Sequence, residues 1–473
     1  MNSLFGFLLS RFRGASDPAG LLKKAVQLRN SGNWSEASVL YRQLLKLHPD
    51  HPGLLTDLGT IEIKLGNHAE GLKWLDQSLR CDPNQAVALS NRAVGLRFTQ
   101  RLEEARLSVE RAIKLQPDYA DAYINLGLVL HDLRLFDQAV SCYERAARLR
   151  PEINAFAKLN KGLIKLLNGQ FTDGWKLYES RWDSMQHKQA RAFSTPLWLG
   201  RSSIAGKALL IHPEQGFGDF IQFCRYALEA EKSGAKVVLE TPAALVSLAS
   251  TLPGNITIIR AGDPLPAHDF HCPIMSLPLA FKTTAGSIPR QTPYLYASPA
   301  KQEIWRAKLG ERRKPRIGLA WSGNPQYMHE GNRRVPLKKL QPLLELPFEF
   351  HVLQKDIRPD DAEALSDYSH VLTSHSSDLH DFEDTAALVS EMDLVVSVDT
   401  SICHLAGALA KEVWVMLSYV PDFRWLLDSS DCPWYPTATL LRQKTPGVWD
   451  DVILEVVSRL KSFPGNTAPA GGA

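Results

Sequence analysis

The chain has 473 residues, which at ~150 residues per domain corresponds to about three domains. Its 54 Lys and Arg residues balance 51 Asp and Glu residues to a net charge of +3, which argues against a nucleic-acid-binding protein, where positive charge is concentrated. The hydrophobic fraction of 44% and the charged fraction of 22% are typical of a globular chain with a core, and no apolar run reaches the ~18 residues of a membrane span.

The N-terminus carries a short apolar run, Leu4–Leu9, whose arginines follow it, whereas a signal peptide has its basic residues before the run. We expect a frayed end or a cap on the element that follows, with a weak membrane-surface role as the alternative. The six cysteines form no C-x-x-C pair and are too few for a disulfide scaffold, which favours a reduced, cytoplasmic location.

Prolines recur every 34 residues in the first third of the chain, at Pro49, Pro83, Pro117 and Pro151. Small residues keep the same step at Ala37, Gly71, Ala105 and Ala139, and again at Gly59, Ala93 and Gly127. Small residues where two helices touch and a proline that closes each unit are the tetratricopeptide signature. The pattern predicts about five stacked helix pairs over residues 18–185, the fifth degenerate, because one pair cannot bury its own apolar face.

Stacked repeats form a concave groove that commonly holds a peptide, so we expect a protein or peptide partner there. Asn91 and Asn125 lie 34 residues apart on the first helices of units three and four. In one interpretation their amides clamp a peptide backbone in this groove; in the other they are solvent-exposed polar residues. We expect the aromatic run Gly174–Trp182 to seal the solenoid against the next domain.

After Arg191, short β-branched runs alternate with helical stretches, which predicts parallel β-α-β units. The expected strands are Ala208–His212, Lys236–Glu240, Ile256–Arg260 and Phe270–Met275, then, beyond a proline-rich hinge, Arg316–Trp321, Glu349–Leu353, His370–Thr373, Leu394–Val398 and Val413–Leu417. We therefore expect two Rossmann-like halves, residues 200–296 and 312–462, with a last helix over Val448–Leu460 and a disordered tail at 463–473.

Ligands of such sheets bind beyond the carboxyl ends of the strands, so the loops there are candidate sites. The first is His212–Asp219, in which Gly216 and Gly218, beside Gln215, allow a tight turn and close approach to a ligand, including an acceptor. Asp219 starts the next helix. It is either an N-cap or a carboxylate able to take a proton from an acceptor hydroxyl.

The second loop follows the apolar strand Leu394–Val398 and leads into a helix of small residues. Thr400 and Ser401 place hydroxyls and free N–H groups at the helix N-terminus, which favours a phosphate or diphosphate. His404, one turn on, adds a donor, and Asp399 caps the helix or orients a sugar hydroxyl. The alternative is an ordinary capped helix with a packed histidine.

Further polar and basic residues follow neighbouring strands and together indicate an anion site. These residues are Asn324, Arg333, Arg334 and Lys355. Each alone would be a solvated surface group, whereas arginines offer bidentate contacts to phosphate oxygens. Asp384 and Thr385 have two interpretations, contacts to a nucleotide or the start of a capped helix, and we prefer the capped helix.

We expect no metal and no resident cofactor. The metal-type residues His268, Asp269, His271 and Cys272 include two neighbours on a predicted strand that point to opposite faces. The aromatic segments Pro421–Trp425 and Trp434–Pro436 form either a lid or part of the core. There is no Walker A, H-E-x-x-H or G-x-S-x-G motif, which removes the common NTPase, zinc-protease and hydrolase classes.

These motifs resemble glycosyltransferase family 9, the heptosyltransferase-like family with the GT-B fold. The resemblance covers about residues 205–460 and rests on Gly218-Asp219 and on Val398-Asp399-Thr400-Ser401 with His404-Leu405-Ala406, where Ser401 replaces the family's usual Gly. It implies Asp219 as general base and Asp399, Thr400, Ser401 and His404 as donor contacts, with Lys355 matched by its strand-end position alone.

Helical repeats before a GT-B part are also similar to the O-linked N-acetylglucosamine transferases. The segments QGFGDFIQFCRY, HCPIMSLPLA and PDFRWLL resemble bacterial repeat-containing glycosyltransferase-like proteins. The expected fold is thus an α-solenoid followed by GT-B. The expected function is metal-independent, inverting transfer of a sugar from a nucleotide-sugar co-substrate to a hydroxyl acceptor. The alternatives are a non-catalytic scaffold with a degenerate GT-B part and a polysaccharide-assembly factor.

Overall fold

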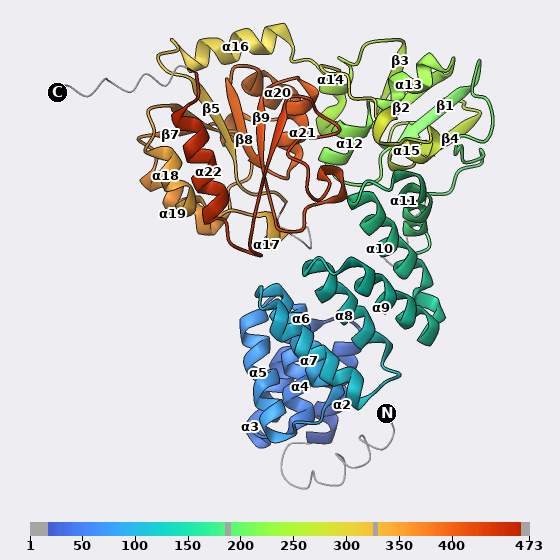
Figure 1. Ribbon diagram of the computed structural model, residues 1–473, viewed down its shortest axis with the longest axis vertical. Coiled ribbons are helices and arrows are strands. Elements are labelled where there is room, and N and C mark those ends of the chain that lie inside the picture. Colours follow the sequence, from blue (N-terminus) through green and yellow to red (C-terminus); the bar gives the residue numbers. More distant parts are fainter. Residues whose placement is uncertain (1–17, 185–190, 325–329, 465–473) are drawn as a thin grey trace, which may run out of the picture. The chain divides into compact units, whose positions relative to one another are not determined.

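The computed structural model describes residues 18–184, 191–324 and 330–464, which are the coloured parts of the ribbon in Figure 1. The N-terminal apolar run and nearly all of the tail expected at 463–473 lie outside these residues. The chain divides into two compact units, Met1–Asn160 and Lys161–Ala473, and each is taken by itself.

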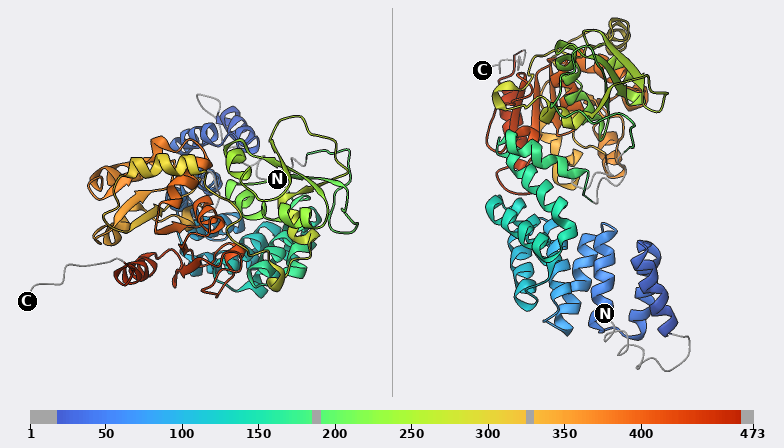
Figure 2. Two further views of the ribbon diagram at one scale, coloured as in Figure 1. Left: turned by 90° about the horizontal axis from the view of Figure 1, so that it is seen from above. Right: turned by 90° about the vertical axis from the view of Figure 1, so that its right-hand side faces the viewer.

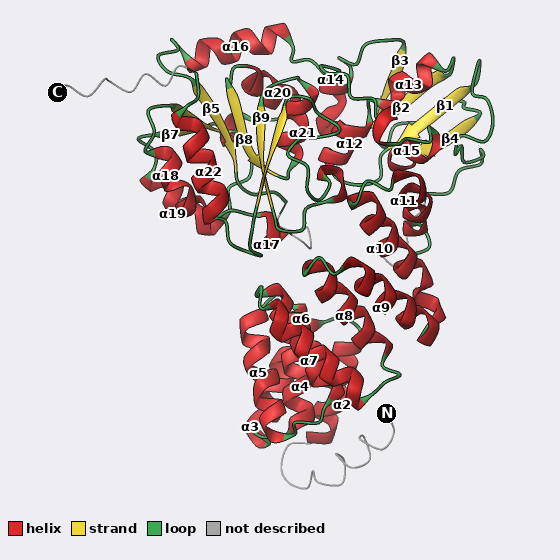
Figure 3. Cartoon of the chain, viewed as in Figure 1, coloured by secondary structure: helices red, strands yellow, loops and turns green. Residues whose placement is uncertain are grey.

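The first unit consists of antiparallel helix pairs, and its described residues contain no strand (Figure 3). The pairs are α2 (Pro18–Asn30) with α3 (Trp34–Leu47), α4 (Pro52–Lys64) with α5 (His68–Cys81), α6 (Ala86–Phe98) with α7 (Leu102–Leu115), and α8 (Ala120–Asp132) with α9 (Phe136–Leu149). Successive pairs stack in chain order, from blue to teal in the right-hand view of Figure 2. The repeat prediction is therefore confirmed for these four pairs.

Small residues are required where the two helices of a pair touch. Ala37, Ala105 and Ala139 are fully buried. A Cβ added to Gly127 would lie 2.4 Å from the Tyr143 ring, which is far closer than real contacts allow. The 34-residue recurrence of small residues thus reflects the close approach of helices.

The fifth helix pair straddles the division between the units. Its first helix, α10 (Asn154–Leu167), begins in the first unit and ends in the second. Its second helix, α11 (Phe171–Tyr178), and the turn η2 (Glu179–Arg181) belong to the second unit. The solenoid expected over 18–185 therefore reaches into the compact unit that holds the sheets.

The second unit contains two parallel sheets, consistent with two Rossmann-like halves. The first comprises β1 (Ala208–His212), β2 (Lys236–Thr241), β3 (Ile256–Arg260) and β4 (Phe270–Pro273) in the order β3-β2-β1-β4. The second comprises β5 (Arg316–Ala320), β6 (Glu349–Val352), β7 (Leu372–Ser374), β8 (Leu394–Val398), β9 (Val413–Leu417) and β10 (Ala438–Arg442) in the order β10-β9-β8-β5-β6-β7. All neighbouring strands pair in parallel.

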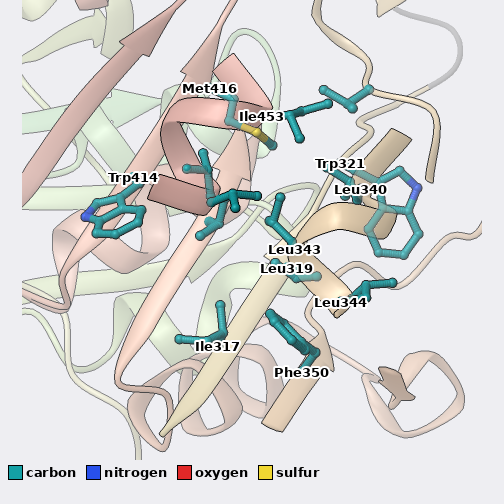
Figure 4. Packing of buried hydrophobic residues seen from close by; sticks show 14 of the residues in the cluster. Ile317, Leu319, Trp321, Leu340, Leu343, Leu344, Phe350, Trp414, Met416 and Ile453 are labelled. Atoms are coloured by element: carbon teal, nitrogen blue, oxygen red, sulfur yellow. The ribbon is translucent and has the colours of Figure 1, made fainter. Parts of the chain in front are cut away.

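Helices alternate with the strands of both sheets. They are α12 (Phe217–Phe223), α13 (Tyr226–Lys232), α14 (Val246–Ala249), α15 (Leu277–Ala280), α16 (Pro299–Leu309), α17 (Glu330–Arg333), α18 (Gln341–Leu344), α19 (Pro359–Asp367), α20 (Phe382–Ser390), α21 (Ser401–Ala408) and α22 (Asp450–Lys461). Apolar side chains of β5, β6 and β9 pack with those of α18 and α22 into a buried cluster (Figure 4). The continuous apolar strands follow from burial on both faces.

Two expectations need correction. The strand β10 was not expected, and it completes the second sheet beside β9. Phe463, placed in the expected disordered tail, packs against Phe348 and Trp414 in the core of this sheet. Among the described helices, none combines the length and the hydropathy that crossing a membrane requires.

Candidate functional site

The two loops singled out in the sequence both leave strands at a point where the sheet order reverses. In the first sheet, β1 lies between β2 and β4, and its loop carries Asp219. In the second, β8 lies beside β5, and its loop carries Asp399. Open parallel sheets bind their ligands outside the carboxyl ends of the strands at such switch points.

Gly218 brings the two loops into contact. It lies in α12, which packs against α21 of the other sheet. A Cβ added to Gly218 would lie 2.9 Å from the His404 ring and 3.5 Å from the Cα atom of Ser401. A larger residue at this position would push the two helices apart.

Asp219 is fixed at the start of α12. Its Oδ2 atom accepts a hydrogen bond from the backbone N–H of Gly216 at 3.1 Å. Gly216 is the N-cap of α12 and Asp219 is its third residue, so the expectation that Asp219 itself is the N-cap is wrong, although its side chain satisfies the N–H group of the capping residue. Its Oδ1 atom accepts a bond from Nη2 of Arg424 at 2.5 Å. Its side chain is 18% exposed, so the carboxylate is largely screened from water but not sealed.

The loop after β8 forms a capped helix start, as one of the two interpretations expected. The Thr400 hydroxyl accepts from the N–H of Ile402 at 3.3 Å, and Ser401 is the half-buried first residue of α21. The His404 ring is buried, stacks on Trp425 at 5.1 Å between centroids, and lies 3.1 Å from the Tyr435 hydroxyl through Nδ1.

Arg424 joins the loop after β1 to its own turn after β9 by ion pairs, and sequence reasoning did not select it. It lies in the buried turn η9 (Phe423–Trp425). Its guanidinium binds Asp219 and, at 2.7 Å, Asp422. The sequence showed only an arginine among aromatic residues in the segment Pro421–Trp425, and the burial of Phe423, Arg424 and Trp425 identifies this segment as core.

The carboxylates of this cluster are perturbed by burial. Burial raises the pKa of Asp219, and the Arg424 charge opposes the rise. Burial, reinforced by the charge of Asp422 and opposed by Arg333 and Arg424, raises the pKa of Asp399 to about 6.

The imidazole of His404 is neutral. Its pKa is held well below the ordinary value by burial and by the charges of Arg424 and Arg225. Its Nε2 atom lies 3.8 Å from the Asp399 carboxylate.

The residues of this cluster do not suit a metal ion. Asp399, Cys403 and His404 place potential ligand atoms within 4.8 Å of one another. Burial, however, raises the pKa of Cys403 well above its ordinary value, so the thiol stays protonated and is a poor ligand. The positive charges of Arg424 and Arg333, which depress the pKa of His404, also oppose a cation there.

The loop that carries Asp219 is anchored from α11 and η2. Arg181 is fully buried and binds Glu214 of this loop at 2.9 and 3.0 Å. It also donates to Glu179 at 2.6 Å and to Ser276 at 2.7 Å. The Gln215 amide donates to the Tyr178 hydroxyl at 3.3 Å.

Aromatic packing reinforces this anchor. Trp175, in α11, meets Phe423 of η9 edge-on at 5.7 Å between centroids and Phe223 of α12 at 6.4 Å. The run Gly174–Trp182 thus packs within the sheet-containing unit, and its expected role in sealing the solenoid against this unit stays a prediction.

The two candidate arginines, Arg333 and Arg334, lie in different surroundings. Arg333, at the end of α17, lies close enough to oppose the raised pKa values of Asp219 and Asp399. Arg334 instead pairs with Asp360 at 2.6 Å and Asp361 at 3.0 Å. Those two carboxylates occupy its guanidinium, so the structure does not bring it to the Asp219 cluster.

Two further expected donor contacts are exposed. Lys355 donates to the carbonyl of His380 at 3.2 Å, and Asn324 follows β5 at the edge of a described segment. Their assignment to a donor site stays a prediction.

The groove asparagines are half-buried and bind neighbouring repeats. Asn91 donates to the Thr60 hydroxyl at 2.8 Å, and Asn125 donates to the Ser90 hydroxyl at 2.9 Å. These bonds join first helices of consecutive repeats. A role in clamping a peptide stays a prediction and would have to exchange these bonds or use the amide oxygens.

The weaker candidates have structural partners. His271 lies 3.2 Å from His212, and the Cys272 thiol is buried in β4. Asp384 pairs with Lys301 at 2.7 Å, and the Thr385 hydroxyl donates to the Asp381 carbonyl, as expected for a capped helix start.

Tetratricopeptide repeat families match the first unit, over residues 28–92, 99–133 and 120–153. The protein FlbA of Caulobacter vibrioides is 24% identical over 500 aligned positions, which cover 93% of this chain and 83% of FlbA. The crystal structure of MamA is 23% identical and covers 37% of this chain and 98% of MamA, with a TM-score of 0.30.

A distant similarity to a named glycosyltransferase covers part of the chain. The probable UDP-N-acetylglucosamine–peptide N-acetylglucosaminyltransferase SPINDLY of Hordeum vulgare is 27% identical over 138 residues. That match covers 28% of this chain and 15% of SPINDLY, so the chain spans only a small part of this relative's length.

Proposed function

We propose that the second unit is a metal-independent, inverting glycosyltransferase, which moves a sugar from a nucleoside-diphosphate donor to a hydroxyl acceptor. The observation that supports this most is the contact between the loops after β1 and β8, made through Gly218 and His404. It sets a half-buried carboxylate, Asp219, beside the N-terminus of a helix that follows a strand, where a diphosphate is favoured.

In this proposal Asp219 is the general base. Burial raises its pKa, which makes the ionised carboxylate a stronger proton acceptor at neutral pH. The acceptor oxygen forms a bond to the anomeric carbon while the bond from that carbon to the diphosphate breaks. The hydroxyl proton goes to Asp219, and the bonding electron pair leaves with the diphosphate.

The departing diphosphate is stabilised by the α21 N-terminus and by nearby cations. Ser401 offers its N–H group in the first turn of α21, and Arg333 adds positive charge near Asp399. A single displacement on the face opposite the leaving group inverts the anomeric centre. The repeats of the first unit would recruit a protein or peptide acceptor.

One observation favours a second function, a non-catalytic scaffold with a degenerate transferase part. Both oxygens of Asp219 already accept hydrogen bonds, one from Arg424 and one from Gly216. A carboxylate held in this way could serve only to join the two sheets. In that case the repeats would carry the function, in protein or polysaccharide assembly.

Calorimetric titration with ADP, GDP, CDP and UDP separates the two functions. A transferase binds one of them, whereas failure of all four to bind would contradict the transferase proposal. With the matching nucleotide sugar, D219N should keep donor binding and lose ~10²–10⁴-fold in transfer. The control is D263N, at an exposed carboxylate, which should match the wild type.

A further inference from the structure

Arg424 has an unusual set of partners for a buried cation. It is 6% exposed, and its guanidinium lies between a carboxylate from the first sheet's loop, Asp219, and one from its own turn, Asp422. Its Nε atom is buried and has no hydrogen-bond partner in the part of the chain that the structure describes. Part of its donor capacity is therefore unused, although the fork of an arginine suits two-point binding of phosphate oxygens.

The turn that carries Arg424 is held in a strained form. Leu426, directly after η9, has φ 56° and ψ 177°, a region that side-chain-bearing residues rarely adopt. Arg442 holds this turn by donating to the carbonyls of Trp425 at 2.7 Å and Leu426 at 3.0 Å. Strain of about 1–3 kcal/mol persists only where the surroundings impose it, and it concentrates at functional sites.

The same turn lies against the proposed diphosphate site. Trp425, the next residue, stacks on His404 of α21. The Arg424 charge also reaches Asp399, whose pKa it lowers against the effect of burial. The guanidinium is thus adjacent to the general base and to the helix whose N-terminus would receive the diphosphate.

We propose that Arg424 is shared between Asp219 and the donor diphosphate. Without donor it neutralises Asp219. When the donor is bound, the guanidinium turns to the phosphate oxygens and leaves the Asp219 carboxylate to accept the acceptor's proton. This inference rests on the proposed transferase function, and it makes Arg424 a residue that couples donor binding to release of the base.

Arg424 would change partners because the donor diphosphate competes with the Asp219 carboxylate for its guanidinium. A diphosphate carries more negative charge than a carboxylate and accepts two parallel bonds from one guanidinium, so it competes well for Arg424. Asp422 holds the arginine through Nη1 at 2.7 Å, which keeps it at the site during the exchange. The order of binding follows, because the base is released only after the donor is present.

A crystal structure of the full chain with the tightest-binding nucleoside diphosphate tests the exchange directly. We expect an Arg424 nitrogen within hydrogen-bond distance of a phosphate oxygen and the bond to Asp219 broken. If a diphosphate is bound while Arg424 remains on Asp219, the inference is overturned and the transferase proposal stands. If no nucleoside diphosphate binds in solution, the transferase proposal itself fails.

Variants give a second test that a folding defect cannot mimic. R424K keeps the charge but loses the planar fork, so its affinity for the nucleoside diphosphate should fall about tenfold, whereas its affinity for the corresponding nucleoside should not change. R459K, at an exposed arginine of α22, is the matched control and should alter neither. Equal diphosphate affinity in R424K and the wild type would overturn the inference.

Discussion

Asp399 shows how burial at one residue makes stability depend on pH. Its pKa is raised from 3.8 to about 6, so between these values the folded chain binds a proton that the unfolded chain does not. The contribution of this group to folding is therefore fully present below the lower value and is lost as pH rises through about 6. The loss amounts to roughly 2–3 kcal/mol, from the size of the shift.

The variant D399N isolates this effect. We expect the free energy of unfolding of the wild type, relative to D399N, to increase by roughly 2 kcal/mol when the pH is lowered from 7.5 to 4.5. Urea denaturation at both pH values measures it. D263N, at an exposed carboxylate, should track the wild type, and a pH-independent difference for D399N would contradict the assignment.

At the residue scale the sequence was informative where a side chain follows a strand. Asp219, Asp399 and His404 were predicted because they lie in or just after loops that follow parallel strands, where such sheets bind ligands, and the structure brings the two loops into contact. Arg424 could not be selected in this way. Its partner Asp219 lies 205 residues away, and no local pattern encodes such a distance.

At the scale of elements, η2 is coupled to the loop after β1 by a buried charge. Arg181 binds Glu214, Glu179 and Ser276, and removing it would leave Glu214 buried without its cation. We expect R181M to lower the free energy of unfolding by about 3–5 kcal/mol, measured by denaturant titration. R459M removes an exposed pair with Glu455 and should cost less than about 1 kcal/mol.

Comparison of R181M with R459M and R181K tests whether the buried network around Arg181 stabilises the unit. If R181M costs no more than R459M, the network around Arg181 does not stabilise the unit. R181K, which keeps the charge without the fork, should fall between R181M and the wild type, since it retains part of the attraction to Glu214.

Most strands were predictable because buried parallel strands are short and continuously apolar. β1, β3, β8 and β9 have the bounds expected of them. β10 has the sequence ATLLR and follows Pro436 with little β-branched content, so local composition did not distinguish it from a loop. Only its pairing with β9 stabilises it as a strand.

At the scale of the whole molecule, the division into two units places α11 and η2 with the sheets. A chain that starts at residue 154 keeps these elements, whereas one that starts at residue 191 loses both the Trp175 and the Arg181 contacts. We expect residues 154–473 to unfold cooperatively. Residues 191–473 should be less stable by at least about 3 kcal/mol or fail to fold.

Urea unfolding followed by circular dichroism compares the two chains. Equal midpoints and slopes would show that the fifth helix pair is dispensable for the sheets, contrary to this expectation. The full-length chain serves as the reference for both.

The contact between Trp175 and Phe423 can form only late in translation, after Phe423 has been made. The two residues are about 250 positions apart, which at ~5–20 residues per second is roughly 12–50 s of translation. During that interval the helix pairs, whose contacts are local, can already fold, while the aromatic side chains of α11 await their partners. We therefore expect the nascent chain to expose the aromatic side chains of α11 for tens of seconds before Phe423 is made.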